Sequence, residues 1–253
     1  MIIKEVIEVL ETYFPLSLQD DWDNSGLQIG NQNKEVKSIM IALNADYLVV
    51  KQAVMKNIDL LITHHPLFFE PIKALNQHEE KGRVVELAIK NNLSIYCSHT
   101  PLDKGGIDYG MNSWAAMELG LKNIDIYGKS SHLRKGENNS SLDVLIKNIK
   151  KTFSLDSVLM SGDSNAEIVN NIVIGLGSGS GYIKEMDSLI DVYITGDCSY
   201  HDAQAVVQNK TFVLIQVPHF VEAIMKKHLK LLLKEHLELP IYLANEEDYI
   251  KIV

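Results

Sequence analysis

Two adjacent histidines, His64 and His65, are the first residues in this sequence whose type and spacing could do chemistry. They follow the largely apolar run 58–62 and precede Pro66, a pattern typical of a buried strand that continues into a loop. Imidazole is the commonest nitrogen ligand for zinc and related metals. Neighbouring side chains on a strand point to opposite faces, so the two rings serve one cavity only if the backbone turns, or else each serves a different ion. Taken alone, the pair could equally be two polar residues at the start of a loop.

Three further predicted strands also end in potential metal ligands. These are His99 and Asp103 after 93–97, Asp197 and nearby His201 after 189–194, and His219 and Glu222 after 211–217. Ligands of open parallel sheets bind beyond the carboxyl ends of the strands. Mixed imidazole and carboxylate donors suit zinc, manganese or iron better than calcium. Together they are numerous enough for two ions, which lie about 3.5–4 Å apart in two-metal sites.

Each of these residues also has a purely structural interpretation. Asp103 lies between Pro101 and a Gly-Gly pair and could make a turn. Glu222 falls in the first turn of an expected helix, where a carboxylate is favoured by the helix dipole. His201 also begins a helix, and His99 could orient a ligand instead of binding metal. Each structural interpretation is reasonable alone. A shared metal site explains all four strand ends at once and is therefore the simpler hypothesis.

The remaining histidines are predicted to have no part in such a site. His228 lies on the apolar face of a helix and is expected in the core, whereas His78, His132 and His236 are expected in solvated loops or helix ends. The glycine run 175–181 lacks the last glycine of a dinucleotide-binding fingerprint, which disfavours that function. It could bring backbone N–H groups to a phosphate or simply make a tight turn, and both alternatives stay open.

The elements that must position these groups alternate between strand and helix. Helices are expected at 3–14, 47–55, 79–91, 109–119, 142–153, 200–208 and 220–236, and strands at 38–43, 58–62, 93–97, 157–160, 172–176, 189–194, 211–217 and 239–243. This order predicts an α/β fold with mixed, mainly parallel sheets covered by helices.

Two polar stretches, 20–30 and 129–140, are expected to be loops. The second lacks periodicity and is the best candidate for a linker or a crossover loop. We therefore expect two α/β lobes, 1–126 and 127–253, and the C-terminal segment could pack back on the first.

Composition limits the possible functions. The chain has 253 residues, of which 46% are hydrophobic and 23% charged, as in ordinary soluble globular proteins. Its formal charge of −9 argues against nucleic-acid binding. No apolar run approaches the roughly 20 residues of a membrane span, and the acidic amphipathic segment 1–14 is not expected to be a signal peptide. The 2 cysteines form no disulfide framework, which favours a cytoplasmic location.

Five segments together resemble the Nif-three-like dinuclear metal-centre family, also known as GTP cyclohydrolase I type 2. They are DWDNSGLQIG (21–30), ITHHPLFF (62–69), SHTPLD (98–103), ITGDCSYHDA (194–203) and VPHFVE (217–222). They occur in the family's order and spread over most of the chain. The resemblance implies two α/β lobes with the metal site between them, a homohexamer, and a small-molecule substrate such as GTP or another nucleotide.

The resemblance also implies roles for individual residues. The family's ligands for two divalent ions (zinc, iron or manganese) correspond to His64, His65, Asp103, His219 and Glu222. His99 and His201 would transfer protons or orient ligands, with Asp197 orienting these histidines. In the family's reaction, water activated by the metal opens the imidazole ring of guanine.

One departure from the family pattern concerns the late histidine and glutamate. Two residues separate His219 from Glu222 where the family has three, and Pro218 stands where the family has glycine. Both spacings leave the pair on one helix face, so the site is retained, while the bridging role of Glu222 is left open. Two other functions also stay open: a non-catalytic metal-binding scaffold that binds other proteins, and a hydrolase of another nucleotide or a phosphoester. Five ligands for two ions leave coordination positions open, which favours catalysis.

Overall fold

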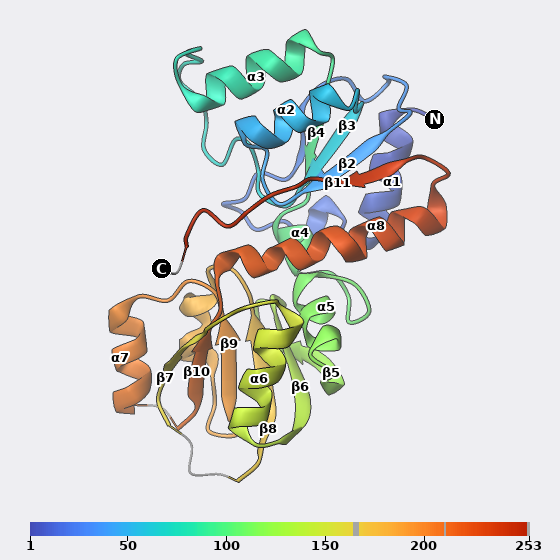
Figure 1. Ribbon diagram of the computed structural model, residues 1–253. Helices are drawn as coiled ribbons and strands as arrows, with labels where there is room; N and C mark the ends of the chain where they lie inside the picture. The colour runs from blue at the N-terminus through green and yellow to red at the C-terminus, as the bar shows by residue number, and fades with distance from the viewer. Residues whose placement is uncertain (164–166, 210, 252–253) are drawn as a thin grey trace. The chain divides into compact units, whose positions relative to one another are not determined.

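A computed structural model of the chain describes residues 1–163, 167–209 and 211–251 (Figure 1). The chain divides into two compact units, each with its own sheet. Unit 1 comprises Met1–Gly105 and Met225–Tyr249, and unit 2 is built on Gly106–Ile224. The α/β class expected from the sequence is confirmed.

The units differ from the lobes expected at 1–126 and 127–253. Residues 106–126 supply helix α5 (Met111–Glu118) and strand β5 (Lys122–Tyr127), and β5 pairs with β6 of unit 2. The C-terminal segment instead completes unit 1, as the sequence had allowed.

The sheet of unit 1 has five strands and is mainly parallel. In sheet order they are β1 (Gly26–Ile29), β4 (Ser94–Cys97), β3 (Leu60–Thr63), β2 (Ile39–Ala42) and β11 (Ile241–Leu243). Pairing is parallel from β4 to β11, and only the edge strand β1 runs antiparallel to its neighbour. The carboxyl ends of β3 and β4 therefore meet at one edge, so the segments that follow them emerge side by side.

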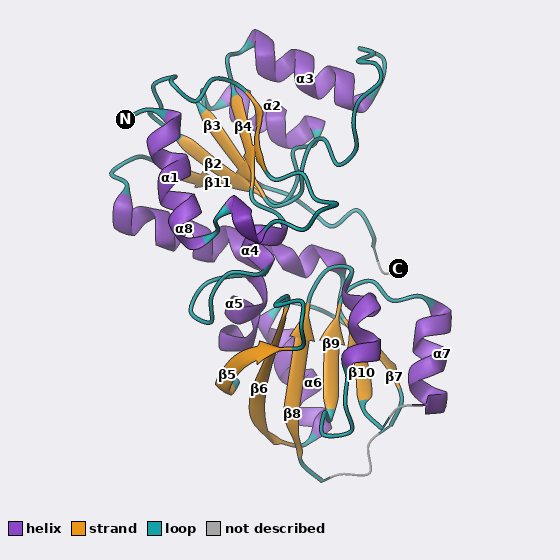
Figure 2. Cartoon of the chain, turned by 180° about the vertical axis from the view of Figure 1, so that it is seen from behind, coloured by secondary structure: helices purple, strands orange, loops and turns teal. Residues whose placement is uncertain are grey.

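Helices cover both faces of this sheet (Figure 2). They are α1 (Ile3–Tyr13), α2 (Tyr47–Met55), α3 (Glu80–Lys90), the short α4 (Thr100–Asp103) and α8 (Ile224–His236). On one face, Met40, Leu61 and Ile95 pack with apolar residues of α2 and α3. Their buried neighbours Ile41 and Ile62 point to the other face because strand side chains alternate. Each fully buried aliphatic side chain contributes about 1.5–3 kcal/mol to folding.

Unit 2 contains a six-stranded mixed sheet. In sheet order the strands are β5 (Lys122–Tyr127), β6 (Leu133–Ser140), β8 (Val169–Gly175), β9 (Val192–Thr195), β10 (Val213–Gln216) and β7 (Leu159–Ser161). Its other elements are α5, α6 (Leu142–Thr152), α7 (Tyr200–Asn209) and the 3-10 helices η2 (Gly179–Glu185) and η3 (His219–Ala223). The strands β8, β9 and β10 are parallel, so β9 and β10 also end at one edge.

Two segments expected to be loops contain strands instead. Residues 26–29 form β1, which pairs with β4, and residues 133–140 form β6, which pairs with both β5 and β8. The linker prediction for 129–140 was therefore wrong. The sequence LRKGENNS is polar because β6 is partly exposed, and its pairing with two neighbours stabilises it despite a weak strand pattern.

None of the helices in the described part of the chain combines the length and the apolar character that crossing a bilayer requires.

Candidate metal centre

The first candidate site lies in unit 1, where β3 ends. The backbone bends at His64 and His65 directly after Thr63, and the two ring centroids lie 4.8 Å apart. The hydroxyl of Thr63 donates to the carbonyl of His65 at 2.9 Å and holds this bend. Of the two alternatives for adjacent histidines, a turn of the backbone is the one that the structure has.

A third imidazole joins them from the end of the neighbouring strand β4. The ring centroid of His99 lies 5.0 Å from that of His64 and 5.7 Å from that of His65. One ligand nitrogen from each of the three rings lies within 4.8 Å of the others, so the group could hold a metal ion. Parallel pairing of β3 and β4 produces this convergence, because both strands end at the same edge.

The orientation of each ring is fixed through Nδ1, which faces an oxygen acceptor. The partners are the Ser98 carbonyl for His64 at 3.2 Å, the Asn44 side-chain oxygen for His65 at 2.8 Å, and the Asp23 carboxylate for His99 at 2.8 Å. An Nδ1–H that donates to oxygen places the ring lone pair on Nε2, the nitrogen that can coordinate a metal. The donor set therefore suits a divalent cation.

Asp103 lies at the end of α4 and adds a carboxylate to this group. Its Oδ1 lies 3.7 Å from Nε2 of His64, whose side chain is completely buried. The expected proximity of Asp103 to the paired histidines is therefore present within unit 1.

Asp23 is an important residue that our interpretation of the sequence missed. It is buried and accepts hydrogen bonds from His99, from the hydroxyls of Ser25 and Thr100, and from the Thr100 backbone. Burial alone would raise the pKa of Asp23, but these hydrogen bonds and the charge of His99 outweigh it and hold the pKa well below its usual range. A permanently ionised Asp23 thus orients His99.

A second buried carboxylate supports the partner of His65. Glu246 accepts hydrogen bonds from the backbone N–H of Leu43 at 2.9 Å and of Asn44 at 3.0 Å, and it pairs with Lys226 at 2.8 Å. Its side chain is only 4% exposed. Glu246 therefore fixes the backbone from which Asn44 reaches the His65 ring.

The second candidate group lies in unit 2, after β9 and β10. The Nδ1 of His219 lies 2.7 Å from the Asp197 carboxylate, and its Nε2 lies 3.0 Å from the carboxylate of Glu222, a buried residue. Hydrogen bonding to Glu222, opposed by burial and aided by both negative charges, raises the pKa of His219 to about 9. Within unit 2, Asp197 thus orients His219.

The glycine run packs against this second group. Gly177 has a φ of +64°, and a Cβ built there would lie 2.1 Å from a carboxylate oxygen of Glu222. A Cβ at Gly196 would lie 2.4 Å from the carbonyl oxygen of Gly177. The glycines are therefore needed for close packing around Glu222, which favours the structural alternative over phosphate binding.

His201 begins a helix, as predicted, whereas His132 does not have its predicted exposure. The His201 side chain is exposed on α7, and its ring packs edge-on to that of Tyr200 with the centroids 5.7 Å apart. Its expected part in proton transfer stays a prediction. His132 was expected to be solvated but is buried. Its carbonyl oxygen accepts a hydrogen bond from Asn112, which draws the segment into unit 2.

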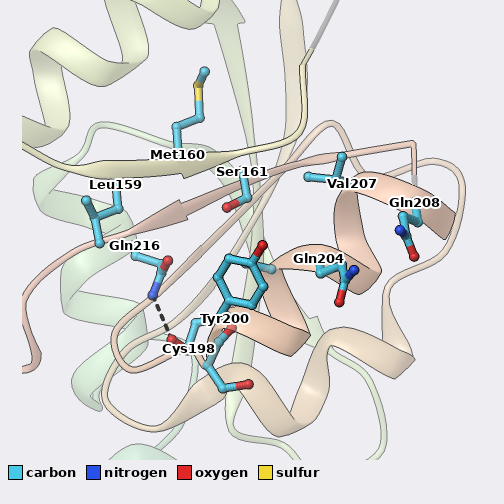
Figure 3. A pocket seen from close by; sticks show the side chains of 11 residues that line it. Leu159, Met160, Ser161, Cys198, Tyr200, Gln204, Val207, Gln208 and Gln216 are labelled. Atoms are coloured by element: carbon cyan, nitrogen blue, oxygen red, sulfur yellow. Dashed lines mark hydrogen bonds between the residues drawn. The ribbon is translucent and has the colours of Figure 1, made fainter.

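A separate hollow in unit 2 lies between β7 and α7 (Figure 3). Its lining includes the exposed Leu159 and Met160, with Gln216 donating to the Cys198 carbonyl at 3.3 Å. Burial raises the pKa of the Cys198 thiol, which keeps it protonated and a poor nucleophile at neutral pH. Among the described residues, this lining contains neither imidazole nor carboxylate, so the hollow is no metal site.

The fold and the imidazole group define an α/β protein with side chains suited to binding a divalent metal. Over residues 1–248 the chain matches the family described as Duf34/NIF3 (NGG1p interacting factor 3). The chain belongs to this family.

Named relatives extend over most of the chain. A Helicobacter pylori protein named GTP cyclohydrolase 1 type 2 is 32% identical over 219 residues, which are 87% of this chain and 86% of that protein. A Clostridium acetobutylicum protein named as a homolog of that enzyme is 32% identical over 209 residues, 79% of this chain and 77% of the other. Among solved structures, Staphylococcus aureus protein SA1388 is similar with a TM-score of 0.91 and 26% identity, covering 100% of this chain and 99% of that one.

Proposed function

We propose that this chain is a divalent-metal-dependent hydrolase of the GTP cyclohydrolase 1 type 2 kind. The observation that carries the proposal is the convergence of His64, His65 and His99, each with Nδ1 held by an oxygen acceptor. The names of relatives at about 32% identity support the reaction class. The substrate would be a small molecule, GTP or another nucleotide.

The proposed ligands for two ions (zinc, iron or manganese) are those that the family resemblance implies: His64, His65, Asp103, His219 and Glu222. Bound divalent ions supply Lewis acidity that activates water near neutral pH. The protein's own part includes holding the rings of His64 and His65 through Nδ1, so that Nε2 is the nitrogen that can coordinate a metal. Because Glu222 already bonds His219 at 3.0 Å, the shortened spacing in this chain is compatible with a shared site for the two side chains.

We assign His99 to proton transfer. Asp23 accepts from its Nδ1–H, so Nε2 is the nitrogen that can take up and release a proton. The geometry also allows His99 to be a third ligand. The metal content of a His99→Gln variant separates the two roles: unchanged content with lost turnover supports proton transfer.

The first experiment measures GTP turnover and formate release on metal-reconstituted protein. The same assay is run on a His64→Ala/His65→Ala double variant. The matched control is His78→Ala, which changes an exposed histidine that is not among the proposed site residues. Turnover that the double variant loses and the control keeps supports the proposal. If wild type and double variant are both inactive while only wild type binds metal, the assignment of GTP falls and a screen of other nucleotides and phosphoesters follows.

A non-catalytic metal-binding protein is the second candidate, favoured by the family's description as an interacting factor. Metal binding without turnover of any nucleotide would favour it. Our proposal also includes the homohexamer that the resemblance implied, which light scattering on purified protein tests.

A further inference from the structure

Two large aromatic side chains stand exposed beside the imidazole group of unit 1. Trp22 is 56% and Phe69 47% exposed, and their ring centroids lie 5.7 Å apart. Both also contact His99, at 5.7 Å from Trp22 and 6.0 Å from Phe69. The two rings therefore form a continuous apolar wall that begins at an imidazole of the candidate metal centre.

The segments that carry the two rings are fixed to each other. The side-chain amide of Asn24 donates to the Phe68 carbonyl at 2.6 Å, and the Phe68 N–H donates to the Gln28 side-chain oxygen at 3.3 Å. Both backbone polar groups of Phe68 are thus held by the segment 22–28, which carries Trp22 and runs into β1. The wall is preorganised, which lowers the entropic cost of binding a ligand there.

The wall borders a hollow, and the residues that line this hollow favour one chemical class of ligand. Its lining combines Trp22, Phe68, Phe69 and Ile72 with the carboxylates of Asp23 and Glu70. Flat aromatic faces attract planar rings, because stacking buries apolar surface and aligns π-systems. The two carboxylates and the absence of lysine or arginine from this lining, within the described residues, make it unsuited to phosphate groups.

We propose that Trp22 and Phe69 bind the planar nitrogen heterocycle of the substrate and hold it beside His99. This inference rests on the proposed function and specifies how the substrate lies: the base stacks on the wall, and any phosphates lie outside it. Three consecutive residues of the sequence DWDNSGLQIG then act on the same binding site. Trp22 supplies a stacking face, Asp23 orients His99, and Asn24 fixes the segment of Phe69.

Tryptophan fluorescence tests the inference independently of turnover. The chain has 2 tryptophans, Trp22 and the buried Trp114, so an added ring that stacks on the wall quenches mainly Trp22. The probes are guanosine, GTP and tripolyphosphate, each titrated into metal-loaded protein. We expect guanosine and GTP to quench the emission with saturation, and tripolyphosphate to leave it unchanged.

Two variants locate the binding. Phe69→Leu removes one aromatic face, keeps the Trp22 reporter and is expected to raise the Kd for guanosine about 10-fold, the order found when base stacking is lost. The matched control Tyr200→Leu removes an aromatic side chain of unit 2 that is 79% exposed, and it should leave the Kd unchanged. Quenching by tripolyphosphate equal to that by guanosine, or an unchanged Kd in Phe69→Leu, would overturn the inference.

The same measurements separate this inference from the proposed function. Saturable guanosine quenching that Phe69→Leu weakens, in a protein without any turnover, would support the stacking wall and sink the hydrolase. Turnover with a KM that Phe69→Leu leaves unchanged would retain the hydrolase and reject the wall.

Discussion

The imidazoles of the two units are held in different ways. In unit 1, three rings converge, and each is bonded through Nδ1 to a single oxygen acceptor. In unit 2, His219 is bonded at both ring nitrogens by carboxylates, Asp197 at 2.7 Å and Glu222 at 3.0 Å. In the first arrangement Nδ1 of each ring faces an oxygen, so Nε2 is the nitrogen that can coordinate a metal when the ring is neutral, whereas the second arrangement stabilises an imidazolium.

This difference shows that the spacing of histidines and carboxylates in the sequence does not by itself tell how readily each histidine can bind a metal. A histidine that is already paired with two carboxylates must lose a proton before it can bind a cation, so metal uptake there competes with an existing ion pair. In unit 1 the oxygen partner of each ring lies at Nδ1, which makes Nε2 the nitrogen available to coordinate a metal. We therefore expect the unit 1 group to dominate metal affinity.

The largest effect should follow from removing a ligand in unit 1. His64→Ala deletes a completely buried imidazole, and we expect metal affinity to fall by more than about 100-fold, beyond the 10–100-fold typical of supporting groups. His219→Ala should reduce affinity less. Metal content after dialysis at graded free zinc, measured by mass spectrometry, compares the two variants. Equal losses would contradict the proposed difference between the units.

The next largest effect concerns the carboxylates that orient the rings. Asp23→Asn should lower metal affinity or turnover about 10–100-fold, because His99 loses its acceptor. It should also destabilise folding by about 2 kcal/mol, since charged hydrogen bonds to Ser25 and Thr100 are weakened. Urea unfolding measures the stability. Asp21→Asn is the neighbouring control and should leave both quantities unchanged.

The ion pair of His219 predicts a pH dependence for the metal-free protein. Its pKa is raised from 6.5 to about 9, so its contribution to stability is complete below pH 6.5 and is lost as the pH rises through 9. The Tm in the presence of a chelator should fall over this interval. His219→Gln should flatten the fall, and an identical pH profile in the variant would exclude the ion pair as its cause.

The smallest effect is expected from Glu246, which acts on His65 only through Asn44. Glu246→Gln keeps the shape but weakens the hydrogen bonds to two backbone N–H groups, so we expect a loss of metal affinity of a few-fold. Glu238→Gln, an exposed change in the same C-terminal segment, serves as control. If Glu246→Gln reduced metal affinity as much as Asp23→Asn does, the effect of Glu246 through Asn44 would not be the smallest, and this ranking would be wrong.

Much of the fold follows from local pattern. The helix 47–55 was predicted with its observed bounds, and in the structure the Asp46 side chain caps it by accepting a hydrogen bond from the Val49 N–H. The strand ends carrying His64, His99, Asp197 and His219 were also predicted, since apolar runs stop there. The polar strand β6 was missed because long-range pairing stabilises it, which no local pattern reveals.

The site was predicted less completely than the strands that carry it. Residue types indicated His64, His65 and Asp103, but the orienting carboxylates Asp23 and Glu246 depend on contacts between segments 76 and 202 residues apart. For Asp23, the available signal was an acidic residue inside a motif otherwise rich in turn formers. For Glu246, a polar C-terminal sequence offered no signal at all.

The discontinuity of unit 1 has a consequence for biosynthesis. Its sheet lacks β11, and Asn44 lacks the carboxylate beneath it, until residue 246 has left the ribosome. Residues 106–224 are made before then and can acquire their own sheet first, since domains generally fold as units during synthesis. The His65 ring would thus gain its final support only after residue 246 has emerged. Until then the candidate metal-binding group of unit 1 would be incomplete, which would disfavour early metal binding by the nascent chain.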